Sequence, residues 1–183
     1  LSSLDGSTGF RLDGVDIGDR SGISVSSAGD VNGDGYSDVI IGALSATPDG
    51  KSNAGESYVV FGKSSGFSAS LDLSSLNGSN GFRLDGVDAR DLSGTSVSSA
   101  GDVNGDGFDD VIIGASDADP DGKSLAGASY VVFGKSSGFS ASLDLSSLNG
   151  ANGFRLDGVR GGDRSGVSVS SAGDVNGDGY SDV

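Results

Sequence analysis

A 72-residue repeat constrains this chain more than any other feature of its sequence. The string Phe-Arg-Leu-Asp-Gly begins at Phe10, Phe82 and Phe154, which are spaced 72 residues apart. Residues 1–72 and 73–144 differ at 13 positions and agree at the other 59, and residues 145–183 continue the pattern as part of a third copy. Repetition at a fixed period indicates supersecondary units that bury their apolar faces by stacking on their neighbours.

Each copy contains four short segments with the composition of β-strands. From Ile23 to Ser27 apolar residues alternate with serine, which is typical of a half-buried strand. Val39–Ile41 is a continuous apolar run, which is typical of a strand buried on both faces. Gly, Asp, Asn and Ser bound every segment. We therefore predict strands over Phe10–Leu12, Ile23–Ser27, Asp38–Gly42 and Ser57–Phe61, with equivalents in the later copies.

Four strands per repeat predict an all-β fold of tandem four-stranded antiparallel blades, as in a β-propeller. Pro48–Lys51 has the composition of a turn, and Leu71–Leu76 could form a single helical turn. The alternative is a β-solenoid, whose shorter repeats of about 20–30 residues fit this period less well. The sequence holds about two and a half repeats, fewer than the four or more blades of a closed propeller. We expect an incomplete ring, a fragment of a longer array, or packing against further copies of the repeat.

The chemistry of the chain is concentrated in a nine-residue acidic loop that every copy carries. In the first copy, Asp30 to Asp38, oxygen-bearing side chains fall at positions 1, 3, 5 and 9. Alternate positions of a tight loop can point at one centre, the glycine at position 6 permits the turn, and the carbonyl of position 7 adds an oxygen. Calcium prefers six to eight such oxygen ligands. The predicted Ca²⁺ ligands are Asp30, Asn32, Asp34, Tyr36 and Asp38 in the first loop, Asp102, Asn104, Asp106, Phe108 and Asp110 in the second, and Asp174, Asn176, Asp178, Tyr180 and Asp182 in the third.

Other interpretations of this loop explain less of it. A plain hairpin turn accounts for its glycines but not for three carboxylates and an amide at alternate positions in three copies. An EF-hand or dockerin loop needs an acidic residue at position 12, where Ile41 and Ile113 stand, and leads into a helix. The glycine-rich β-helix motif repeats every nine residues, which this loop does not do.

The composition excludes several functional classes. The chain carries 11 Lys+Arg against 26 Asp+Glu, and its net charge of −15 disfavours nucleic acid and anionic membrane surfaces. It contains no His and no Cys, which removes the commonest acid–base and nucleophilic groups. No apolar run approaches the roughly 20 residues that a membrane span requires. We therefore predict no enzyme, no nucleic-acid binding and no membrane insertion.

Two further sets of residues have structural interpretations that we prefer to functional ones. An arginine lies two residues before an aspartate in each Phe-Arg-Leu-Asp-Gly string, and we predict a cross-strand ion pair. The residues are Arg11 and Asp13, Arg83 and Asp85, and Arg155 and Asp157. Tyr58 and Tyr130 are expected to pack in the core rather than to form a sugar-binding platform. The Gly-Lys-Ser triplets at 50–52 and 62–64 lack the first glycine of a phosphate-binding loop and are predicted to be turns.

The segment Ser21–Ala43 resembles the FG-GAP repeat, the blade unit of the integrin α-subunit β-propeller and of bacterial surface proteins. Ser21-Gly22 stands where the family has Phe-Gly, and Ile41-Gly42-Ala43 stands near its Gly-Ala-Pro end. The resemblance implies calcium loops between the first and second strands of each blade. It divides the chain into an outer strand of a preceding blade (1–20), two blades with calcium loops (21–92 and 93–164) and the start of a further blade (165–183).

These observations predict a secreted or cell-surface calcium-binding module for adhesion or for interaction with a protein or glycan, with calcium as a structural staple. The alternative is an architectural subunit of a surface layer, sheath or filament. In either case other copies of the repeat are expected partners. The near-identity of the copies favours the architectural interpretation, because a specific ligand face usually needs unlike blades.

Overall fold

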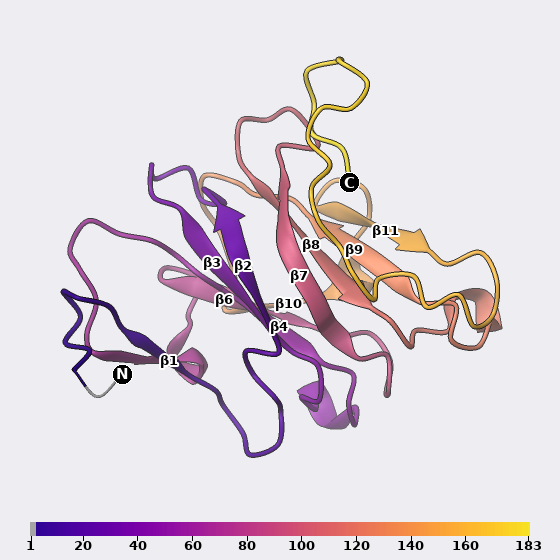
Figure 1. Cartoon of the computed structure of the whole chain (residues 1–183), viewed down its shortest axis with the longest axis horizontal. Helices are drawn as coiled ribbons and strands as arrows, with labels where there is room; N and C mark the ends of the chain where they lie inside the picture. Colours follow the sequence, from indigo (N-terminus) through magenta and orange to yellow (C-terminus); the bar gives the residue numbers. More distant parts are fainter. Residues whose placement is uncertain (1–2) are drawn as a thin grey trace.

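The computed structural model describes residues 3–183 and contains two four-stranded antiparallel sheets that lie side by side (Figure 1). The first sheet is built in chain order from neighbouring strands, so that each strand pairs with the one before it. These strands are β2 (Ser24–Gly29), β3 (Asp38–Ala43), β4 (Glu56–Val60) and β6 (Gly81–Asp85). The predicted all-β fold of four-stranded blades is therefore confirmed, within the residues that the structure describes.

The second sheet repeats the first one 72 residues later. Its strands are β7 (Ser93–Gly101), β8 (Asp110–Ala115), β9 (Ala128–Val132) and β11 (Gly153–Asp157). The registers match as well, since Ile41 pairs with Tyr58 as Ile113 pairs with Tyr130. Residues 165–183 contribute only isolated bridges, one of them joining Gly127 to Ser165.

Three short strands do not belong to the two meanders. β1 (Arg11–Asp13) pairs in parallel with β5 (Ser70–Asp72), and the equivalent β10 (Ser142–Asp144) pairs in parallel with β6. β10 thus adds a fifth strand to the outer edge of the first sheet, although it belongs to the second repeat. The sequence did not predict β5 or β10. β1 was predicted one residue early, and its assignment to a preceding blade stays a prediction, as do the blade boundaries at 21, 93 and 165.

Four single-turn 3-10 helices occur at equivalent places in the two complete repeats. Two of them lie inside the predicted turn Pro48–Lys51 and its equivalent, and two lie inside the predicted helical turn Leu71–Leu76 and its equivalent. They are Pro48–Gly50, Leu73–Ser75, Pro120–Gly122 and Leu145–Ser147. Asp72 caps the second of them by accepting the N–H of Ser74 at 2.8 Å. Within residues 3–183 no helix has the length and apolar character needed to cross a bilayer.

The core lies between the two sheets and is shared by them. β2 packs against β7 at the centre of the molecule (Figure 1). One cluster of buried side chains contains Ile40 and Val59 from the first sheet together with Val97 from the second. The backbones approach so closely that a Cβ on Gly42 would overlap the carbonyl oxygen of Gly94. Stacking of one repeat on the next therefore buries the apolar faces that a single repeat would expose.

Candidate metal-binding loops

Each acidic loop connects the first and second strands of a sheet. The first runs between β2 and β3, and the second between β7 and β8. Gly33 and Gly35 adopt φ values of 71° and 87°, in the left-handed region that favours glycine. Gly105 and Gly107 repeat them at 75° and 89°. The Asn-Gly-Asp-Gly string is thus required by the backbone turn as well as by the side-chain chemistry.

The first side chains of the loop turn inward over their own backbone. In the first copy, Asp30 accepts the N–H of Asp34 at 3.0 Å and that of Gly35 at 2.9 Å. The Oδ1 atom of Asn32 also accepts the N–H of Asp34, at 2.9 Å. Asp34 in turn accepts the N–H of Tyr36 at 2.9 Å. The same bonds recur in the second and third loops, so the three copies share one conformation.

The carboxylate at position 9 has a different environment. Asp38 is buried, and its two oxygens accept the N–H of Val31 at 2.9 Å and that of Gly62 at 2.8 Å. Burial is the main cause that raises the pKa of Asp38 to about 6, and the carboxylates of Asp34 and Asp30 raise it as well. Asp110, in the second loop, has the equivalent bonds and a pKa raised, chiefly by burial, to about 6.

The donor set suits a hard cation. Each predicted ligand side chain of the loop offers an oxygen atom to a metal, and oxygens are the ligands that calcium prefers. The carboxylates of Asp34 and Asp30 help to raise the pKa of Asp38, and a divalent cation in the loop would offset this repulsion. In this conformation, however, the carboxylates are directed at backbone N–H groups. Across residues 3–183 no three His, Cys, Asp or Glu side chains are arranged as a metal site.

Consecutive loops also contact each other, which the sequence did not predict. A Cβ on Gly33 would overlap the ring of Phe108, and one on Gly105 would overlap the ring of Tyr180. Asp109 donates its N–H to the carbonyl of Asp30 at 3.2 Å and accepts the N–H of Asp30 at 2.7 Å. The aromatic residue at position 7 of each loop thus covers the glycine at position 4 of the loop before it.

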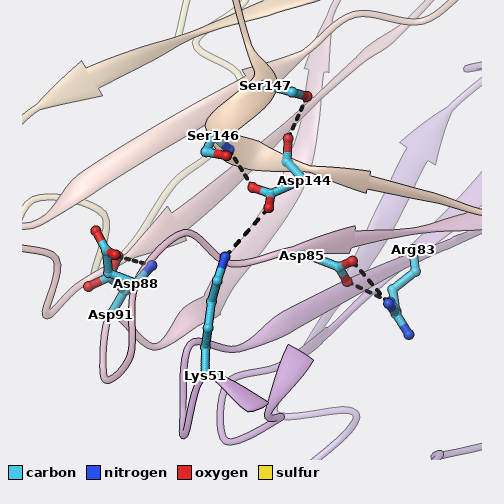
Figure 2. Close-up of polar contacts among 8 residues, drawn as sticks. All are labelled: Lys51, Arg83, Asp85, Asp88, Asp91, Asp144, Ser146 and Ser147. Atoms are coloured by element: carbon cyan, nitrogen blue, oxygen red, sulfur yellow. Dashed lines mark hydrogen bonds and ion pairs between the residues drawn. The ribbon is translucent and has the colours of Figure 1, made fainter. Parts of the chain in front are cut away.

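The predicted cross-strand ion pair is wrong in its geometry. Arg83 and Asp85 lie two residues apart on β6 and form a bidentate pair within that strand, with Nη2 2.9 Å from Oδ2 (Figure 2). Alternate residues of a strand share a face, which explains this pairing. The acidic group nearest to Arg83 on the neighbouring strand β4 is Glu56, whose Oε1 lies 3.9 Å from Nε of Arg83, a longer distance. Tyr58 and Tyr130 are buried in the core, as predicted.

Two side-by-side four-stranded antiparallel sheets, each with an acidic loop between its first and second strands, define a protein of propeller-blade repeats. A family model of the FG-GAP repeat matches residues 21–60 and 93–132. The chain belongs to the FG-GAP repeat proteins, with repeats of the integrin α-subunit type.

The similar proteins are much longer than this chain. Integrin alpha-4 of Xenopus laevis is 31% identical over 175 residues, which are 95% of this chain and 15% of that protein. Integrin alpha-PS2 of Drosophila melanogaster is 31% identical over 133 residues, which are 70% of this chain and 9% of that protein. The phosphatidylinositol-glycan-specific phospholipase D of Bos taurus is 32% identical over 119 residues, 65% of this chain and 14% of that enzyme. The chain thus spans less than a fifth of the length of each of these relatives.

Proposed function

We propose that this chain is an extracellular calcium-binding interaction module in which calcium acts as a structural staple. The observation that carries the proposal is the threefold recurrence of one acidic loop with one inward-turned conformation. A plain turn needs the glycines of this loop but not its repeated carboxylates. The likeness to integrin α subunits supports an extracellular location and a role in adhesion, with a surface protein or a glycan as the ligand.

The proposed ligands are the side chains at positions 1, 3, 5 and 9 and the backbone carbonyl at position 7 of each loop. Binding would exchange the N–H bonds of the first three side chains for bonds to the cation. In the first two loops these residues are Asp30, Asn32, Asp34, Tyr36 and Asp38, and Asp102, Asn104, Asp106, Phe108 and Asp110. In the third they are Asp174, Asn176, Asp178, Tyr180 and Asp182.

The expected energy is large enough to matter for folding. Extracellular calcium modules bind with dissociation constants of about 0.1–1 mM. At ten times that concentration one site adds about 1.4 kcal/mol to the free energy of unfolding. Three sites would contribute several kcal/mol, which is comparable to the whole stability of many domains. The folded protein would then have a larger free energy of unfolding outside cells, where calcium is abundant, than in the absence of calcium.

A thermal melt followed by circular dichroism tests the proposal, first in EDTA and then with millimolar calcium or magnesium. We expect a reversible rise in Tm with calcium that magnesium does not reproduce. The variant Asp34→Asn/Asp106→Asn/Asp178→Asn should lose most of this rise, because asparagine keeps the hydrogen-bond acceptor but removes the charge. The matched control Asp49→Asn/Asp121→Asn removes two exposed carboxylates elsewhere and should keep the rise. An equal Tm in EDTA and calcium would refute the proposal.

A second candidate function is architectural, in a surface layer, sheath or filament. The contact of Phe108 with Gly33 and its equivalent, Tyr180 with Gly105, favour it, because the same interface already recurs within the chain. Negative-stain electron microscopy in calcium separates the two functions. Ordered arrays or fibres would support the architectural role, whereas dispersed particles that bind a cell surface would support the adhesive one.

A further inference from the structure

The outer edge of the first sheet is covered by β10, which lies in the chain between β9 and β11 of the second sheet. We define the linker as the 14-residue segment Lys-Ser-Ser-Gly-Phe-Ser-Ala-Ser-Leu-Asp-Leu-Ser-Ser-Leu, which occurs identically at residues 63–76 and 135–148. The second linker contains β10, which pairs with β6, and the first contains β5, which pairs with β1. Arg83 donates its N–H to the carbonyl of Ala141 at 2.9 Å, and Arg11 donates to Ala69 at 3.0 Å.

Side chains of the linker fix its place on the edge. Phe139 stacks on Phe82 with ring centroids 4.8 Å apart, as Phe67 stacks on Phe10 at 4.0 Å. Lys51 of the first repeat reaches Asp144 of the second linker at 3.5 Å, where Asp144 also caps the helical turn that follows (Figure 2). The linker therefore binds through backbone hydrogen bonds, an aromatic contact and an ion pair.

The chain has three such edges and two such linkers. The third edge is β11, whose sequence Phe-Arg-Leu-Asp-Gly is the same as that of the other two. Among residues 3–183 no strand pairs with its outer side. Leu156 is 42% exposed on this edge, whereas its equivalent Leu84 on the covered edge is fully buried. Leu84 lies in a buried cluster with Ala115 and Tyr130 of the second sheet, and Leu143 of the second linker packs against this cluster. The exposed Leu156 therefore lacks the cover of both a following sheet and a linker.

A hollow between the second linker and the residues just before β11 is larger than its equivalent in the first repeat. It measures about 590 Å³ and includes Phe133, Lys135 and Asn152 in its lining. The equivalent hollow in the first repeat, lined by Phe61, Lys63 and Asn80 among others, measures only about 170 Å³. Next to the smaller hollow, the ring of Phe139 from the second linker packs on the ring of Phe61, with the ring centroids 5.2 Å apart.

We infer that the outer edge of β11 is a binding site for the linker of another copy of the repeat. The linker adds to β11 as a parallel strand, in the register in which Ser142 faces Arg83. The N–H of Arg155 donates to the carbonyl of the alanine in the added linker. Phe154 stacks on the phenylalanine ring of that linker, and Lys123 forms an ion pair with its aspartate. This names the surface by which copies of the repeat associate, and it does not depend on calcium.

A synthetic peptide with the linker sequence provides the first test. Added to the isotope-labelled chain, it should shift the NMR signals of Phe133 and residues 153–157 and slow the hydrogen exchange of the Arg155 amide by at least about tenfold. A control peptide with serine in place of its phenylalanine and first leucine should do neither. Equal effects of the two peptides would overturn the inference.

Two protein variants test the same contacts from the other side. Arg155→Pro removes the outward N–H at an edge position that tolerates proline, and it should abolish peptide binding while the Tm changes little. Lys123→Glu is the second variant, in case the first lowers the Tm, and it should weaken peptide binding by reversing the charge opposite the peptide aspartate. Unchanged binding to both folded variants would contradict the proposed register.

An extended chain decides the matter if the free peptide binds too weakly to detect. Appending a copy of residues 112–148 after Val183 completes the third repeat and supplies its linker within the same molecule. The Arg155 amide should then be protected to the level of the Arg83 amide. An unprotected Arg155 in the folded extended chain would overturn the inference, and either result would leave the calcium proposal standing.

Discussion

The hydroxyl oxygen of Ser24 accepts a hydrogen bond from the backbone N–H of Val97, 3.0 Å away in the next repeat. Ser96 and Val169 form the same bond at 3.1 Å. These bonds join the first strands of consecutive repeats, β2 to β7 and β7 to the segment that follows β11. A side chain of one copy thereby satisfies a backbone donor of the next, so that stacking of the repeats has a polar component as well as an apolar one.

Ser24→Ala should lower the free energy of unfolding by about 1–2 kcal/mol, because the half-buried N–H of Val97 loses its acceptor. Ser26→Ala is the matched control on the same strand, since no hydrogen bond of its side chain is found in the structure, and it should change stability little. Urea denaturation monitored by circular dichroism measures both. A loss of equal size in the two variants would show that the Ser24–Val97 bond contributes nothing specific.

Gly33→Ala should be more harmful than Gly177→Ala. Both glycines occupy position 4 of an acidic loop with similar φ values, 71° and 77°, so both substitutions carry a similar backbone cost of about 1 kcal/mol. Only Gly33 is covered by a ring of the next copy, whereas a Cβ on Gly177 would meet nothing within 4 Å. The additional loss in Gly33→Ala, about 1–3 kcal/mol, reports the contact between loops. Denaturation in EDTA gives the comparison, and equal losses would show that the ring contact is not needed.

Tyr58→Phe should destabilise the chain more than Tyr130→Phe. The hydroxyl of Tyr58 donates to the buried carboxylate of Glu56, and its removal leaves that carboxylate less satisfied, at a cost of about 1.5–3 kcal/mol. At the position equivalent to Glu56 the second repeat has Ala128, so Tyr130 has no such acceptor. Thermal denaturation of the two variants at pH 7 makes the comparison. The prediction fails if Tyr130→Phe costs as much as Tyr58→Phe.

The calcium-free protein should become more stable as the pH falls from 7 to 5. Burial raises the pKa of Asp91 to about 6, with Asp88 and Asp119 adding to the effect. Between about pH 4 and pH 6 the folded state therefore holds a proton that the unfolded state has lost, so stability decreases as the pH rises through this window.

Asp91→Asn tests this pH dependence. The variant keeps an acceptor for the N–H of Asp88 but cannot ionise, so it should gain about 1–3 kcal/mol at pH 7 and lose part of the pH slope. The control Asp121→Asn changes an exposed carboxylate nearby and should retain the slope. Urea denaturation of the original chain and of both variants, in EDTA at pH 5 and pH 7, makes the comparison. An unaltered slope in Asp91→Asn would mean that other groups carry it.

The strands of the two meanders could be predicted because their patterns are local. Ile23–Ser27 alternates and Val39–Ile41 is continuous, and both patterns lie within a single strand. The expected burial of the alternating strand needs a neighbouring sheet, since Val25 is 58% exposed whereas its equivalent Val97 is buried in the core shared by the two sheets. β5 and β10 escaped prediction because they have little apolar character of their own. The sequence Ser-Leu-Asp-Leu-Ser-Ser also contains a helix cap, and its strand partner lies far away in the sequence, as Arg83 does from Ser142. Pairing between distant segments leaves no local signature.

For the acidic loops, too, the features that depend on the loop's own residues could be predicted, and those that depend on distant residues could not. The spacing from Asp30 to Asp38 and the glycines between them indicated a tight loop with converging oxygens, and the inward turn of Asp30, Asn32 and Asp34 agrees with it. The buried carboxylate of Asp38 accepts a hydrogen bond from the N–H of Gly62, which lies outside the loop, just after β4. The cover of Gly33 by Phe108 depends on how repeats stack. Neither could follow from the loop sequence alone.

The crossing of each linker to the preceding sheet means that the unit of sequence and the unit of folding are out of step. A single blade excised at residues 21–92 would carry β5 without its partner β1 and would leave the outer edge of β6 without β10. Anyone who shortens, lengthens or recombines such arrays should therefore keep a sheet together with the later linker that covers its outer edge. A piece over residues 21–148 would hold the whole first sheet, β2, β3, β4 and β6, together with the strand β10 that covers it.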